Sequence, residues 1–173
     1  MAFVLFRLLF SFQIGHKLGK KGDLDMTEGW AKNKVAQIRG EAERKRLRDA
    51  KVLSDRELLV VDLPKKWAAL REILCKKVDA FDLEYGTEVL IWESTSSNEV
   101  IVRIKDSETK LHGRLSSRDK SIEFDGGSRS GCYDATVVGN EVVLRDHYSD
   151  KVYSIEEIAE SVLDSLLNYL PAA

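Results

Sequence analysis

The feature that most constrains the fold is a change of residue pattern near Leu83. Before this point the chain is rich in lysine and arginine and has the spacing of helices. After it come six short stretches that alternate apolar and polar side chains, followed by one acidic helical stretch. Alternation with period two predicts strands with one buried face, and short connections force neighbouring strands to run antiparallel. The sequence therefore predicts an α+β fold.

Six strands are expected, at residues 88–93, 99–105, 109–116, 120–125, 132–138 and 141–148. Gly139-Asn140, between two pairs of valines, is typical of a hairpin turn. Period-two counting places twelve apolar side chains on one face: Val100, Val102, Ile104, Leu111, Leu115, Ile122, Phe124, Tyr133, Ala135, Val137, Val142 and Leu144. We expect an antiparallel meander of five or six strands, packed on this face by two helices.

The opposite face of the predicted sheet is polar and somewhat basic. Its candidate binding residues are Arg103, His112, Arg114, Arg145 and His147. If no element covers them, these side chains form a shallow surface for an anionic ligand or an acidic protein segment. A solvated face without a ligand is the alternative, because antiparallel sheets commonly leave one face in water.

The two covering helices are predicted from their apolar stripes and their first residues. One begins at Pro64, after a possible cap at Asp62, and its stripe starts at Trp67. The other begins with a Ser-x-x-Glu capping box at Ser154. A second Ser-x-x-Glu pattern, at Ser54, predicts that a new helix or turn begins there. A helix-meander-helix domain is therefore expected over residues 63–173.

Residues 26–62 are expected to form a basic helical arm. Between residues 32 and 51 there are eight basic and three acidic side chains, a local charge of +5. Val35, Ile38 and Ala42 form a short apolar stripe, which favours burial against a second copy of the chain or against another protein. Two alternatives are a solvated helix with intrahelical ion pairs and a nucleic-acid surface, although the run lacks aromatic residues that stack on bases.

The first 25 residues are a separate segment. Residues 2–14 are apolar apart from three positions, but they are too few to cross a bilayer, which needs about 20 residues. Three interpretations stay open. The segment is an interfacial membrane anchor, a helix that packs on the domain or on a partner, or a stretch foreign to the natural protein, whose start would then be Met26.

Residues that carry chemistry are sparse. Two cysteines, Cys75 and Cys132, fit free thiols in a reducing compartment, and therefore a cytoplasmic protein. No metal site and no cofactor are expected, because neither cysteine has a second cysteine or a histidine at ligand spacing. Asp146, His147 and Asp150 offer a base with an orienting carboxylate, but neighbours on a strand point to opposite faces. Cys132 and His147 should face each other across the last hairpin, which permits a Cys–His dyad.

These observations lead to ranked function hypotheses. The net charge of −2 gives no reason to expect nucleic-acid binding by the whole chain. The leading hypothesis is a non-catalytic cytoplasmic module that binds a protein partner, or itself, through the arm, the outer sheet face or both. An enzyme acting on an anionic substrate at the outer sheet face is the first alternative, and a nucleic-acid binder using residues 32–51 is the second. A cavity lined by buried polar groups between sheet and helices would favour the enzyme, and continuous helix packing would favour the module.

Overall fold

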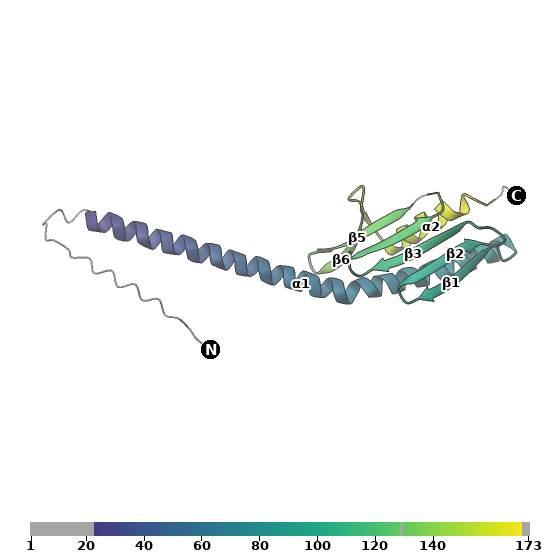
Figure 1. Cartoon of the computed structure of the whole chain (residues 1–173), viewed down its shortest axis with the longest axis horizontal. Coiled ribbons are helices and arrows are strands. Elements are labelled where there is room, and N and C mark those ends of the chain that lie inside the picture. The colour runs from purple at the N-terminus through teal and green to yellow at the C-terminus, as the bar shows by residue number, and fades with distance from the viewer. Residues whose placement is uncertain (1–22, 129, 171–173) are drawn as a thin grey trace, which may run out of the picture. The chain divides into compact units, whose positions relative to one another are not determined.

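The computed structural model of the chain describes residues 23–128 and 130–170, with side chains from Gly29 onward. Its elements are α1 (Asp23–Tyr85), β1 (Leu90–Ser96), β2 (Glu99–Ile104), β3 (Lys110–Ser116), β4 (Ser121–Gly126), β5 (Gly131–Val138), β6 (Glu141–Asp146), β7 (Val152–Tyr153) and α2 (Ile155–Leu167). The chain divides into two compact units between Leu47 and Arg48, and the second unit contains the sheet (Figure 1). The predicted α+β class is confirmed.

Seven strands form one antiparallel sheet in which each strand pairs with the next along the chain. This is the expected meander, with one strand more than the six predicted. The extra strand, β7, has only two residues, which are too few to form an alternating pattern. It follows a turn in which Asp150 has a φ of 57°, a left-handed conformation that aspartate tolerates better than most residues. Gly139-Asn140 joins β5 to β6, as the hairpin pattern predicts.

The sheet has one covered face, against which α2 and the part of α1 within the second unit pack, and Figure 1 shows this part of α1 and α2 behind the strands. Eleven of the twelve apolar positions assigned to this face are buried, and the twelfth, Val137, is half-buried. Trp67 of α1 is 2% exposed, its ring centroid lies 6.3 Å from that of Phe124, and its indole N–H donates to the carbonyl of Ser97 at 2.9 Å. Fully burying a large apolar side chain of this kind stabilises the fold by about 1.5–3 kcal/mol.

The first covering helix does not begin or break where the sequence patterns predict. Ser54 and Pro64 both lie inside α1, so the helix starts predicted at these residues are wrong. The reason is burial, because apolar residues of α1 are buried at intervals of three or four positions on both sides of the proline: Leu59, Leu63, Trp67, Leu70, Leu74 and Val78. Proline removes the N–H that would bond the carbonyl of Val60, but Val60 is 67% exposed and water can reach it.

Hydrogen bonds fix the ends of both helices. At the end of α1, a carboxylate oxygen of Asp82 accepts the backbone N–H groups of Val89 at 3.0 Å and Leu90 at 3.1 Å, where β1 begins. At the start of α2, the Ser154 hydroxyl accepts the N–H of Glu157 at 3.1 Å, and the Glu157 carboxylate accepts the N–H of Ser154 at 2.8 Å. The capping box predicted at Ser154 is therefore confirmed.

The described part of the first unit, residues 23–47, consists of helix alone. Trp30, Val35, Ile38 and Leu47 are between 48% and 69% exposed. Within residues 23–128 and 130–170, no helix combines the length and apolar character needed to cross a bilayer. The apolar stretch at residues 2–14 lies outside the described residues, so its three interpretations stay open.

Candidate functional site

The outer face of the sheet, which lies opposite the helices, contains all five binding residues named from the sequence. Arg103 lies on β2, His112 and Arg114 on β3, and Arg145 on β6, and His147 follows β6 directly. Three strands separate Arg103 from Arg145. From β2 to β6 there are four strand-to-strand spacings, and at the usual spacing these add up to roughly 19 Å. The five residues are therefore spread over the face and do not form one compact site.

The outer face is not basic, contrary to the prediction. Along β1–β6 the strand register places six acidic and four basic side chains on this face. The acidic residues are Glu93, Glu99, Glu123, Asp125, Asp134 and Glu141, and the basic residues are Arg103, Lys110, Arg114 and Arg145. Charges of opposite sign meet across strands: Arg103 Nε lies 2.8 Å from Glu93 Oε1, and Arg114 Nη2 lies 2.5 Å from Glu123 Oε2. The pairing neutralises two of the predicted anion-binding arginines. Since both pairs are partly exposed, each adds little to stability.

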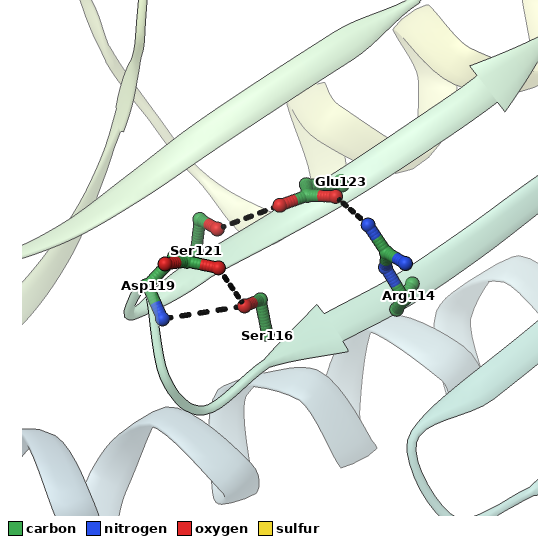
Figure 2. Close-up of polar contacts among 5 residues, drawn as sticks. All are labelled: Arg114, Ser116, Asp119, Ser121 and Glu123. Atoms are coloured by element: carbon green, nitrogen blue, oxygen red, sulfur yellow. Dashed lines mark hydrogen bonds and ion pairs between the residues drawn. The ribbon is translucent and has the colours of Figure 1, made fainter.

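Two separate sets of polar contacts lie side by side here, one on the outer face and one in the turn between β3 and β4 (Figure 2). The Ser121 hydroxyl donates to the second carboxylate oxygen of Glu123 at 3.2 Å. The Ser116 hydroxyl donates to the Asp119 carboxylate at 2.7 Å and accepts the Asp119 N–H at 3.2 Å. These bonds hold together the two ends of the turn, residues 117–120, and thereby position the side chains that the turn carries.

A cavity of about 390 Å³ lies between this turn and α1, wholly within the second unit. Its wall is largely apolar, formed by Leu59, Val60, Leu63 and Pro64 of α1 and by Leu115 of β3. Its remaining lining residues are Ser117 and three exposed cations, Arg56, Arg118 and Lys120. Within residues 23–128 and 130–170, none of the three cations forms an ion pair. We call this feature the turn cavity.

The turn cavity was missed by the sequence reasoning because of the predicted helix break at Pro64. Four of its lining residues lie on α1 between Leu59 and Pro64, a stretch that the sequence patterns assign to the end of the arm and to a new helix start. The only local indication was the pair Arg118 and Lys120 in a short turn, which by itself is indistinguishable from ordinary solvated charge.

Three side chains at the β5–β6 end of the outer face lie close together. Cys132, Asp134 and His147 each offer a donor atom, and these atoms lie within 4.8 Å of one another. His147 Nδ1 is 2.8 Å from Asp134 Oδ2. The backbone N–H of His147 donates to the carbonyl of Cys132 at 2.9 Å, so the two residues face each other as the hairpin register predicts. Asp134 was not included in that prediction, although it shares the face of Cys132 two residues away.

The surroundings of this cluster do not activate the thiol as a nucleophile. Burial raises the pKa of the Cys132 thiol, and the negative charges of Asp134 and Glu123 raise it further. Reactive cysteines instead have lowered pKa values beside cations. The carboxylate of Asp146 also has another role, because it accepts the N–H groups of Tyr148 and Ser149 at 2.8 Å each, and these bonds lower its pKa. Asp146 thus closes a turn and does not orient the ring of His147.

The apolar stripe of the predicted arm, Val35, Ile38 and Ala42, is exposed on α1. A binding partner for this stripe stays a prediction.

Searches against protein-family models, curated proteins and solved structures each found no match to this chain.

Proposed function

We propose that this chain is a non-catalytic binding module, and that the turn cavity binds a peptide segment of a partner protein in which apolar side chains are flanked by aspartate or glutamate. The observation that carries this proposal is the combination of an apolar wall with three cations that have no ion-pair partner among the described residues. The apolar wall supplies affinity, and the cations supply charge complementarity and orientation.

A peptide fits better than a small molecule because apolar surface continues beyond the cavity. Val60, which lines it, is 67% exposed, and its neighbour Val61 is 56% exposed. Leu53, seven residues before Val60 and therefore on the same side of the helix, is 60% exposed. Exposed apolar residues next to a groove are typical of protein interaction sites. An apolar side chain of the partner would enter the cavity while its acidic neighbours reach the cations.

The interior gives less support to an enzyme. Among the described residues, Ser121 and Ser165 are buried and not titratable, and the one buried residue with a titratable side chain is Tyr133, whose pKa is raised by burial. Neither His112 nor His147 lines the turn cavity or any of four other surface cavities on the described residues. These five cavities would therefore not exclude water from a reaction at either histidine or orient a substrate there.

The test uses fluorescent peptides of one length, with leucines at the same positions and with glutamate, glutamine or lysine between them. Anisotropy titrations of the full chain should give the tightest binding for the glutamate peptide and the weakest for the lysine peptide. The double substitution Arg118→Glu with Lys120→Glu should weaken binding of the glutamate peptide by about tenfold or more, equivalent to about 1.4 kcal/mol. It should improve binding of the lysine peptide.

The matched control is Arg48→Glu with Lys51→Glu, which makes the same change of charge at two exposed positions on α1 outside the turn cavity. This control should retain binding of the glutamate peptide. An equal loss in the control would assign the binding to the basic helix at residues 32–51 and overturn the proposal. Displacement of the peptide by an equimolar fatty acid would make the cavity a small-molecule site and would also contradict it.

A further inference from the structure

The cluster formed by Cys132, Asp134 and His147 lies on the outer face, apart from the turn cavity, and its donor set is that of a transition-metal site. A thiol, a carboxylate and an imidazole lie with their donor atoms within 4.8 Å of one another. In a tetrahedral zinc site with bonds of about 2.0–2.3 Å, donor atoms are separated by roughly 3.3–3.8 Å. Small side-chain rotations therefore suffice to bring the three donors around one ion.

We propose that Cys132, Asp134 and His147 form a site for a zinc ion. Thiolate and imidazole favour zinc over magnesium or calcium, which prefer sites made of oxygen ligands. On binding, the thiol proton leaves to solvent, and the imidazole of His147 coordinates through Nδ1 while its ring proton is on Nε2. A thiolate, a carboxylate and a neutral imidazole around Zn²⁺ give a site of zero net charge.

Backbone geometry fixes the donors more firmly than their position on a surface suggests. Cys132 and Asp134 are two residues apart on β5 and therefore point to the same face. The N–H of His147 donates to the carbonyl of Cys132, which holds the histidine opposite the cysteine at the end of the hairpin. Sites built on paired strands are more precise than sites on loops.

Three protein ligands leave one coordination position for water. The nearest further carboxylate by register is Glu123, which lies opposite Cys132 on β4. Glu123 is already bonded through both oxygens, to Arg114 and to Ser121. The His147 and Asp134 side chains are 54% and 42% exposed, so an ion and its water can reach the site from solvent. This arrangement matches zinc sites that keep an open position.

The test is a titration of the full chain with cobalt(II), which replaces zinc and gives a charge-transfer absorption band when a thiolate coordinates it. The chain carries Cys75→Ser and His16→Gln, so that Cys132 is the one remaining thiol and the N-terminal histidine cannot compete. We expect one cobalt per chain, a thiolate band, and loss of the band when one equivalent of zinc is added.

The variants His147→Gln and Asp134→Asn should each weaken cobalt binding by more than about tenfold, because even changes outside the ligand shell cost 10–100-fold. The fold should tolerate His147→Gln, since more than half of this side chain is exposed. The matched control is His112→Gln, at the other outer-face histidine, and it should leave the titration unchanged. Absence of a thiolate band, or equal weakening by His112→Gln, would overturn the proposal.

Discussion

The pattern Ser-x-x-Glu occurs at Ser54 and again at Ser154, and of these two only Ser154 begins a helix. At Ser154 the capping box forms and α2 follows, whereas Ser54 lies in the interior of α1. The difference is in the residues that come before. Ser154 follows β7 and has an extended backbone with φ −73° and ψ 163°. Residues 43–53, before Ser54, are mostly good helix formers and include no glycine or proline. A capping pattern therefore marks a helix start only where the preceding residues leave the helix.

Pro64 extends this comparison from local pattern to tertiary packing. The sequence pattern predicts Pro64 as the first residue of a helix, which is the favoured helical position of proline. It lies instead inside α1, between Leu63 and Trp67, which are both buried against the sheet. Burial of the apolar stripe on both sides outweighs the local cost of the proline. Predictions that separate a continuous α1 from a helix beginning at Pro64 follow from this.

The largest expected effect is that of Leu63→Ala, which should lower the free energy of unfolding by about 2–5 kcal/mol in urea denaturation. Leu63 is 3% exposed and belongs to the core only if α1 is continuous. Val61→Ala is the matched control, because Val61 is 56% exposed, and it should change stability by less than about 0.5 kcal/mol. Equal effects of the two substitutions would mean that the core contacts of the helix end at Pro64.

The next effect is a gain in stability. Pro64→Ala should raise the free energy of unfolding by about 1–3 kcal/mol, because it supplies an N–H for the Val60 carbonyl and removes the clash of the proline ring with the preceding turn. If a helix began at Pro64, the same substitution would be neutral or destabilising, since proline is well suited to the first helical position. The urea midpoint, with an unchanged m-value, distinguishes the two results.

Alanine substitutions at Ser54 and Ser154 should differ in their effect on stability, but by less than the changes at Leu63 and Pro64. Ser154→Ala should destabilise the fold by about 1 kcal/mol through loss of the cap. Ser54→Ala should be neutral or stabilising by up to about 0.5 kcal/mol, because alanine is the better helix former. Thermal unfolding of both variants gives the comparison. A loss at Ser54 as large as that at Ser154 would show that a helix start exists at both places.

The contribution of this cap depends on pH. Hydrogen bonding of the Ser154 N–H to the Glu157 carboxylate lowers the pKa of Glu157. A carboxylate with a lowered folded-state pKa stabilises the fold above the unfolded pKa, near 4.3, and this contribution is lost as the pH falls through the folded value. The difference in stability between the wild-type chain and Glu157→Gln should therefore narrow below about pH 4, because the variant has no carboxylate to titrate.

The sequence predicted the sheet better than the sites, for a physical reason. Strand faces follow from period-two alternation alone, which is why the core positions from Val100 to Leu144 were assigned almost without error. The hairpin register likewise placed Cys132 opposite His147. The turn cavity depends on how α1 packs beside Leu115, and the charge of the outer face depends on which acidic residues the register brings beside Arg103 and Arg114. Such pairings between elements have no local sequence pattern.

Charge changes on the outer face should alter the stability of the fold only weakly. Arg114→Glu places a carboxylate beside Glu123 and should lower the unfolding midpoint slightly, and adding Arg145→Glu should change the midpoint little further. The charge-swapped variant, Arg114→Glu with Glu123→Arg, should recover most of this loss because it restores an opposite-charge pair. If the swapped variant instead unfolds at a much lower temperature, the arginine is an internal structural residue and the outer face is not a free binding surface.

The smallest effect on stability is expected in the first unit, at the exposed stripe of Val35, Ile38 and Ala42. The double substitution Val35→Glu with Ile38→Glu should leave the unfolding midpoint unchanged. The matched control, Asn33→Glu with Gln37→Glu, adds the same charge at exposed polar positions. Sedimentation should show a lower mass for the first variant alone if the stripe binds a second copy.

The salt dependence of association distinguishes a second copy of the chain from a foreign partner at this stripe. Two copies would bring together two segments with a charge of +5 each, and added salt should therefore strengthen their association by screening the repulsion. An acidic partner would be held partly by attraction, and salt should weaken its binding. A wild-type chain that stays monomeric at high protein concentration in both low and high salt would exclude self-association and leave a foreign protein as the partner of residues 32–51.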